Sequence, residues 1–159
     1  MKFLKSCAVV LIICTTFLAG CSSIQSLNFK NKKPSKFYYT EEMLNCFKDK
    51  KCEINILSTK FYKGQRMDEG ATLTLRKFFK YVKNEDFIDP PSNLKKEPEY
   101  KLFLTFNKEK YIIDIYNEDL ISIYPWDGAY EKDYISMKNT YVSYNLYHLC
   151  KYIIDNSKA

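Results

Sequence analysis

Three runs rich in aromatic and β-branched residues follow one another in the second half of the chain. They cover Tyr100 to Phe106, Tyr111 to Tyr116 and Leu120 to Tyr124, and short polar stretches separate them. Such runs are typical of strands, and connections this short join neighbouring antiparallel strands. The sequence therefore predicts an antiparallel meander, which restricts the fold to one built on such a sheet.

Apolar and polar side chains alternate along the first two runs. Lys101, Thr105 and Asp114 fall on one side, and the opposite side carries Leu102, Leu104, Phe106, Tyr111, Ile113 and Ile115. This pattern predicts one buried face and one wet face. The wet face would be a docking surface unless the N-terminal helix or residues 84–99 cover it, and its apolar candidates are Phe103, Ile112, Tyr116, Ile121 and Ile123.

Helical patterns precede and follow the meander. We expect a short helix over residues 41–50 with Thr40 as its N-cap, and a second helix that opens at Asp68 and Glu69. The apolar stripe of the second helix is Leu75, Phe78, Phe79 and Val82. A final helix, capped by Asn139 or Thr140, has the stripe Val142, Leu146, Leu149, Cys150, Ile153 and Ile154.

The order of these elements indicates an α+β fold with two layers. Strands are expected at residues 54–62 and 133–137 in addition to the meander, while residues 84–99 form a proline-containing connection. The expected sheet is antiparallel, has four to five strands and carries helices on one face. The β-α-β4-α order, preceded by a short helix, resembles the TATA-binding-protein-like layout, which implies a shape and no function.

The N-terminus has the pattern of an export signal. Lys2 and Lys5 precede an uncharged stretch, Cys7 to Leu18, that is too short to span a membrane. The sequence Leu18-Ala19-Gly20-Cys21 that follows resembles the lipobox of bacterial lipoproteins. The resemblance implies that residues 1–20 are a signal peptide and that the Cys21 thiol carries a diacylglyceryl group. We therefore expect a lipid-anchored, extracytoplasmic protein on the outer face of the cell membrane.

The excess of positive charge lies outside the expected domain. Six of the 25 basic residues and none of the 19 acidic residues precede Phe37, so residues 37–159 carry 19 of each. A nucleic-acid-binding domain needs a basic surface, so nucleic acid is not an expected partner. Residues 21–36 are rich in Ser, Asn and Lys, which predicts a disordered tether before a single globular domain at 37–159.

Residues for catalysis or metal binding are scarce. The chain has one histidine, His148, and this residue and Cys150 point in different directions on a helix because they are two positions apart. No catalytic site, metal or cofactor is expected. Carboxylates could still supply an acid/base pair or a calcium loop, although their spacing selects no pair among Asp114, Glu118, Asp119, Asp127, Glu131 and Asp133.

Three cysteines follow Cys21. Outside the cytoplasm Cys46 and Cys52 could form a disulfide, and Cys150 on the final helix would then be a buried free thiol. Pairing of Cys150 with either of the others, or three reduced thiols, remain alternatives.

The segment Tyr124 to Tyr130 is the candidate recognition site. It contains the single tryptophan, Trp126, between two tyrosines and beside Asp127, a composition enriched at binding surfaces. The expected binding surface comprises Tyr116, Tyr124, Trp126, Asp127 and Tyr130. The alternative is that Trp126 folds back and closes the end of the core.

The lipobox, the Lys-rich segment, the composition rich in Tyr, Asn, Ile and Lys and the Tyr124 to Gly128 segment together resemble a family of small uncharacterised lipoproteins of clostridial-type Gram-positive bacteria. The family implies no activity. We expect a non-catalytic protein-binding or accessory module anchored to the membrane, whose partner is an envelope protein. The alternatives are a binder of cell-wall carbohydrate and a carboxylate-dependent hydrolase.

Overall fold

The computed structural model describes residues 32–94 and 96–157. The expected signal peptide, Cys21 and residues 22–31 of the expected tether lie outside these residues. The compact unit begins at Lys32, so it includes the last five residues of the segment expected to be a tether. Among the described residues, no helix is both long enough and apolar enough to cross a membrane.

The fold is α+β, as predicted. Its helices and strands occur in the order α2 (Tyr38–Asp49), β1 (Glu53–Ser58), β2 (Lys63–Arg66), α3 (Glu69–Tyr81), β3 (Phe87–Ile88), β4 (Tyr100–Thr105), β5 (Lys110–Asn117), β6 (Leu120–Pro125), β7 (Asp133–Ser136) and α4 (Leu146–Asn156). Single 3-10 turns lie at Asn84–Asp86 and Val142–Tyr144.

The described strands form a single antiparallel sheet of seven strands in the order β2-β1-β4-β5-β6-β7-β3, which is wider than the four to five strands expected. The predicted strand 54–62 ends at Ser58, and the chain turns back into β2, whose sequence KGQR is polar because it is an exposed edge. At the other edge the two-residue strand β3 lies within the predicted 84–99 connection. Strand β2 is polar, and β3 has only the two residues Phe87 and Ile88, too few to show a period. The TATA-binding-protein-like layout therefore has fewer strands than the observed sheet.

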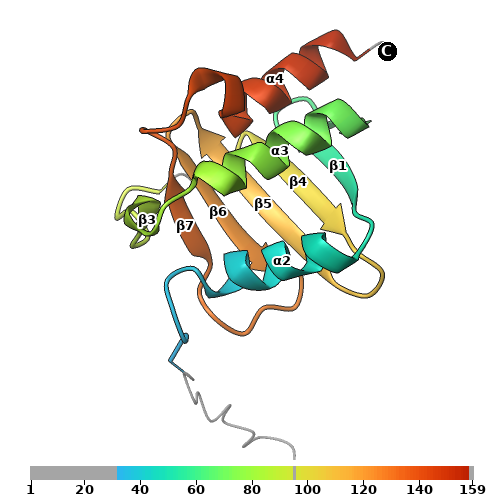
Figure 1. Cartoon of the computed structure of the whole chain (residues 1–159). Helices are drawn as coiled ribbons and strands as arrows, with labels where there is room; N and C mark the ends of the chain where they lie inside the picture. Colours follow the sequence, from blue (N-terminus) through green and yellow to red (C-terminus); the bar gives the residue numbers. More distant parts are fainter. Residues whose placement is uncertain (1–31, 95, 158–159) are drawn as a thin grey trace, which may run out of the picture. The chain divides into compact units, whose positions relative to one another are not determined.

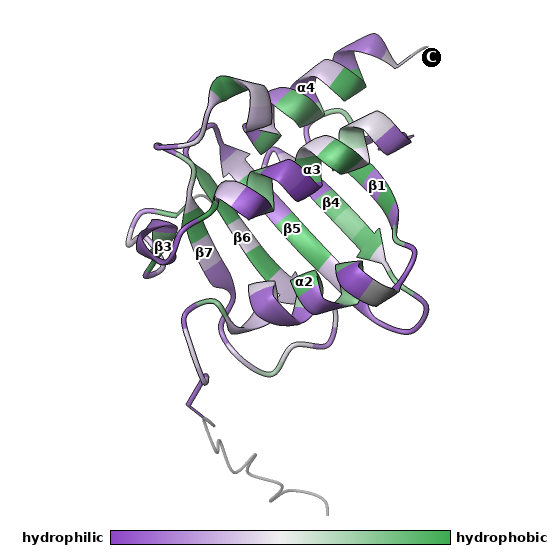
Figure 2. Ribbon diagram, in the orientation of Figure 1, coloured by the Kyte–Doolittle hydropathy of each residue, from purple (hydrophilic) through white to green (hydrophobic). Residues whose placement is uncertain are grey.

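All three described helices cover the same face of the sheet (Figure 1). Between the helices and this face lies the core, in which Leu102, Leu104, Ile113 and Ile115 are fully buried, as the alternation predicted. Figure 2 shows hydrophobic stretches along the central strands, whereas the helices alternate hydrophobic and hydrophilic bands. The helix stripes therefore bury their apolar sides against the strands.

Helix α2 begins at Tyr38, earlier than the predicted 41–50, and Thr40 lies inside its first turn. The carboxylate of Asp133 replaces an N-cap side chain: its Oδ2 accepts hydrogen bonds from the Thr40 backbone N–H and hydroxyl, each at 2.7 Å. Lys33 Nζ lies 2.5 Å from the other oxygen of Asp133. A negative group at a helix N-terminus is favourable, so this contact stabilises α2 from a distant strand.

Helix α4 begins later than predicted. Its N-cap is Asn145, whose side chain accepts from the N–H groups of Tyr147 and His148, and not Asn139 or Thr140. The segment between them forms a 3-10 turn that leaves Val142 74% exposed, while Leu146, Cys150 and Ile154 are buried in the core. The first apolar residue of the predicted stripe therefore belongs to the preceding turn.

The face opposite the helices, here called the open face, carries Phe103, Ile112, Asp114, Tyr116, Ser122 and Tyr124. Ile121 and Ile123, which were expected here, are fully buried in the core instead. In β6 the polar Ser122 lies between Ile121 and Ile123, and this alternation places the two isoleucines on the core face, opposite Ser122. One part of the open face is covered as the alternative predicted, because Ile88 and Leu94 pack on Tyr116, Leu120 and Tyr134.

Candidate functional site

The candidate recognition segment leaves the sheet at the end of β6. The Trp126 N–H donates to the Lys110 carbonyl at 2.9 Å, which extends the pairing of β5 and β6, and the Gly128 N–H donates to the Pro125 carbonyl at 3.1 Å. The chain packs tightly at this turn. A Cβ at Gly128 would lie 2.9 Å from the Tyr39 hydroxyl, so a larger residue here would force the turn or the Tyr39 side chain to shift.

Trp126 does not close the core. Its side chain is 70% exposed, whereas Pro125 before it is half-buried. Trp126 lies at the edge of a hollow of about 430 Å³, lined by Glu42, Lys108, Glu109, Lys110, Tyr111, Pro125, Trp126 and Asp127. Three segments build this hollow: α2, the turn between β4 and β5, and the loop that follows β6. We call it the Trp126 hollow.

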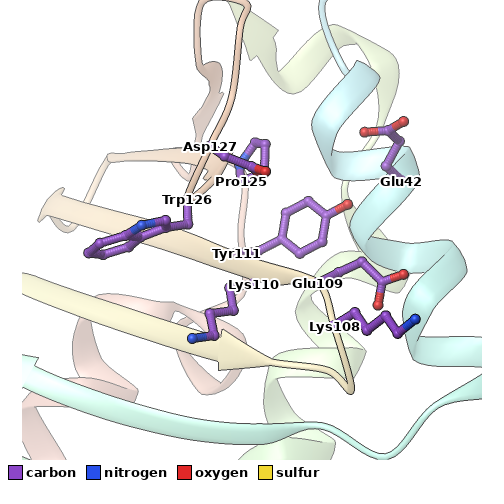
Figure 3. A pocket seen from close by; sticks show the side chains of 8 residues that line it. All are labelled: Glu42, Lys108, Glu109, Lys110, Tyr111, Pro125, Trp126 and Asp127. Carbon is purple, nitrogen blue, oxygen red and sulfur yellow. The ribbon is translucent and has the colours of Figure 1, made fainter.

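The aromatic rings of the hollow point in different directions. Figure 3 shows the Tyr111 ring directed toward α2, with Glu42 on the helix beyond it, and the Trp126 indole directed away from α2. Trp126 also lines a smaller cavity of about 220 Å³ on the open face, together with Phe103, Thr105, Lys110 and Ile112. The indole therefore lies between two depressions and is accessible from both.

The charged groups of the Trp126 hollow have both signs. Glu109 Oε1 lies 2.6 Å from Lys50 Nζ, and this contact holds the pKa of the Glu109 carboxyl below its usual value. Burial raises the pKa of the Tyr111 hydroxyl above its usual value. The hollow thus offers ammonium and hydroxyl donors beside carboxylate acceptors around an exposed aromatic ring.

Tyr130, in the loop that follows β6, contacts the start of α2. The Tyr39 hydroxyl accepts a 2.6 Å hydrogen bond from the Tyr130 N–H, and the rings of Tyr38 and Tyr130 meet edge-on with centroids 5.5 Å apart. A hydrogen bond to Glu42 raises the pKa of Tyr38 to about 12. Tyr130 therefore fastens the loop to α2 and is not one of the residues that line the Trp126 hollow.

The other residues of the predicted binding surface lie in different places. Tyr124 is half-buried on the open face, where burial and the nearby Asp114 carboxylate raise the pKa of its hydroxyl. Tyr116 is only 3% exposed, and its hydroxyl is 3.3 Å from the Ser122 hydroxyl. Asp127 is exposed and lines the Trp126 hollow. Of the five predicted residues, Trp126 and Asp127 line the hollow, and Tyr124 lies next to them along β6.

The cysteines described by the structure are free thiols. Cys46 and Cys52 are half-buried and Cys150 is buried. Burial raises the pKa of Cys52 to about 12, and Cys46 is close enough to contribute to this increase. Among residues 32–94 and 96–157, no group of three or more His, Cys, Asp or Glu side chains could hold a metal ion.

The chain matches a known protein family over most of its length. A family model described as a domain of unknown function (DUF4883) matches residues 33–150, which is well over half of the chain. The chain belongs to the DUF4883 family. The matched range contains every residue of the Trp126 hollow and begins after the expected signal peptide.

A solved structure is also similar to this DUF4883 chain. It is a crystal structure of a protein from Clostridium perfringens that is described as a lipoprotein, with 34% sequence identity and a TM-score of 0.71. The similarity covers 79% of this chain and 99% of that chain. No curated protein matches the chain. The family and this structure confirm the expected relationship to clostridial-type lipoproteins.

Most residues of the hollow in the DUF4883 domain were not predicted as site residues. Glu42 belongs to a helix that was expected to be structural, and Lys108 and Glu109 occupy what was interpreted as an ordinary polar turn. The position of the turn before β5 could have been predicted. Because β5 and β6 are antiparallel neighbours, the residues before β5 lie beside the residues after β6. The sequence pattern of α2 does not indicate that this helix packs beside the same end of the sheet.

Proposed function

We propose that this DUF4883 chain is a lipoprotein held on the outer face of the cell membrane through Cys21, and that its domain binds envelope carbohydrate without catalysis. The lipobox at Leu18 to Cys21 and the similarity to a clostridial protein described as a lipoprotein support the anchor. Two acyl chains make such an anchor stable. The domain would then work at the cell surface, where glycans are abundant.

The exposed indole of Trp126 at the edge of a polar hollow carries the binding proposal. Sugar rings combine apolar C–H faces with hydroxyl groups, so they bind where an aromatic ring lies beside hydrogen-bonding side chains. Trp126 offers the ring, and Lys108, Lys110 and Asp127 offer donors and acceptors within the same hollow. The backbone bond from Trp126 to Lys110 holds the segment in place before a ligand arrives.

A protein partner is the second candidate. The open face is less suited to it than expected, because Asp114, Lys101 and Lys132 place charges across it and Leu94 covers one part. An exposed patch of aromatic and aliphatic side chains at the end of α3 favours a protein instead. It comprises Tyr81, Tyr141 and Val142, which are 54%, 70% and 74% exposed, and Tyr81 also stacks on Tyr144.

A hydrolase receives less support from the hollow. Carboxylates of Glu42, Glu109 and Asp127 line it, and glycoside hydrolysis needs one carboxyl that remains protonated to act as an acid. The ion pair with Lys50 lowers the pKa of Glu109, which makes it a poorer proton donor. We therefore propose binding and not catalysis.

Calorimetric titration of the full-length chain in detergent with chitotetraose, a neutral tetramer of N-acetylglucosamine, tests the proposal. We expect measurable binding that Trp126→Ala abolishes and Trp126→Phe partly retains, because phenylalanine keeps a smaller stacking surface. Tyr152→Ala is the matched control, since Tyr152 is 68% exposed on α4. Binding that is equally strong in wild type and Trp126→Ala would refute the proposal, as would absence of binding to chitotetraose and to isolated peptidoglycan.

A further inference from the structure

A buried carboxylate lies at the centre of the open face. Asp114 on β5 pairs with Lys101 on β4 and with Ser122 on β6, and Ser122 pairs in turn with Tyr134 on β7. The Asp114 side chain is only 2% exposed. A carboxylate that is removed from water in this way needs positive partners.

Two lysines provide them. Lys101 Nζ lies 3.3 Å from Oδ1 of Asp114, and Lys132 Nζ lies 2.7 Å from Oδ2. One lysine would neutralise the carboxylate, so the second leaves the cluster with a net charge of +1. The lysine side chains remain 29% and 33% exposed, respectively, and an ammonium has three donors, so both can reach a further acceptor from the solvent side.

The cluster is close to the proposed carbohydrate surface. Lys132 Nζ lies 4.0 Å from the centroid of the Tyr124 ring. Tyr124 pairs with Ile112, which lines the open-face cavity together with Trp126. Along β5, Asp114 follows Lys110 by four residues, which is about 13 Å in an extended strand. Between the indole and the lysines lies the apolar row of Phe103, Ile112 and Tyr124. A ligand of two sugar rings could therefore contact Trp126 and the lysines together.

We infer that Lys101 and Lys132 bind an oxyanion carried by the glycan, so that the ligand of this domain is an acidic carbohydrate with a carboxylate. This inference rests on the proposed carbohydrate function and specifies its substrate class. Charge complementarity supports it, because a cluster with one surplus positive charge matches a singly charged oxyanion. Each ammonium contacts a different oxygen of Asp114, and an ammonium has three donors, so each lysine keeps donors for a ligand oxyanion.

The test compares two disaccharides that differ by one lactyl ether group: chitobiose, which is neutral, and N-acetylglucosaminyl-N-acetylmuramic acid, whose lactyl group carries a carboxylate. Each is titrated into the full-length chain at low and high salt. We expect the acidic disaccharide to bind about tenfold more tightly at low salt, which is the effect of one charge-assisted hydrogen bond. The difference should shrink at high salt because screening weakens the attraction.

Lysine variants test whether the preference for the acidic disaccharide depends on Lys101 and Lys132. Lys101→Met should remove the preference for the acidic disaccharide and leave chitobiose affinity unchanged, and Lys101→Arg should retain the preference. Asp114 remains paired with Lys132 in these variants, so the fold is preserved. Lys132→Met provides an independent variant, and Lys80→Met on the exposed side of α3 is the matched control.

Equal affinity for the two disaccharides, or a preference that survives in both Lys101→Met and Lys132→Met, would overturn the inference. So would Lys101-dependent binding of phosphatidylglycerol vesicles without any preference between the disaccharides, because the oxyanion would then be a lipid headgroup. The proposed carbohydrate function would stand in these cases provided that Trp126→Ala still abolished binding. Failure of Trp126→Ala to reduce affinity for either disaccharide would refute the proposed function itself.

Discussion

Thr40 and Asp133 lie 93 residues apart in sequence and are joined by two hydrogen bonds of 2.7 Å, one from the Thr40 backbone and one from its hydroxyl. Asp133 is fully buried, and Lys33 supplies the opposite charge. The start of α2 is thereby connected to β7 and to the first residues of the compact unit.

We expect Asp133→Ala to lower the free energy of unfolding by about 3 kcal/mol, because it leaves a helix N–H and the Lys33 ammonium without their buried partner. Urea denaturation measures this change. Asp89→Ala is the matched control: Asp89 pairs with Lys36 at 2.9 Å, but its side chain is 80% exposed, so the ion pair contributes little. Equal destabilisation by both variants would contradict the role assigned to Asp133.

Gly128 provides a prediction about the shape of the Trp126 hollow. Gly128→Ala places a methyl group 2.9 Å from the Tyr39 hydroxyl and 3.1 Å from Pro125, so the turn must shift. We expect a loss of about 1 kcal/mol in stability, as for other overpacked sites, and a weaker affinity for chitotetraose. Gly70→Ala in α3 is the control, since its Cβ would meet Asp68 at an ordinary 3.5 Å. An unchanged affinity in Gly128→Ala would show that the turn does not position Trp126.

Thiol reactivity tests the environment of the cysteines. Burial raises the pKa of Cys52 to about 12 and raises that of Cys150 as well, compared with about 8.5 for an exposed thiol. At pH 8 we expect iodoacetamide to modify these two cysteines at least tenfold more slowly in the native chain than in urea, because little thiolate is present.

The predicted Cys46 to Cys52 disulfide is tested by peptide mapping without reduction. We expect an oxidised sample to contain this bridge and a free thiol at Cys150, because Cys46 and Cys52 are half-buried while Cys150 is enclosed in the core. A bridge that includes Cys150 would contradict this pairing.

Tyrosine ionisation predicts how stability depends on pH. The pKa of Tyr147 is raised to about 12 by burial and a hydrogen bond to Glu99, and burial also raises the pKa of Tyr111. In the unfolded chain tyrosines ionise near pH 10, so the unfolded state loses protons first. Stability is therefore complete below about pH 9 and should fall as the pH rises from 10 to 12. Urea denaturation at several pH values measures the slope, and Tyr111→Phe should make it shallower. A constant free energy of unfolding between pH 8 and pH 11 would disprove the prediction.

The sequence predicted the parts of the fold that depend on local periodicity. The alternation in residues 100–106 and 111–116 assigned Leu102 and Ile113 to the core, and Asp68 was recognised as the start of α3, where its side chain accepts from the Ala71 N–H. The edge strand β2 could not be predicted in this way, because a polar strand on the rim of a sheet has no apolar side to reveal it. Asn145 was not predicted as a cap because Val142 extends the apolar periodicity of α4 into the preceding turn.

By itself, the sequence determined which side chains could face the core within each strand and helix, and it contains the lipobox that predicts the anchor at Cys21. Only the tertiary structure decided that α2, the turn before β5 and the loop after β6 meet around Trp126, and that two lysines converge on Asp114. The physical reason is that side-chain periodicity is a property of neighbouring residues. The convergence of distant segments depends on strand register and helix docking, which the packing of the whole core selects.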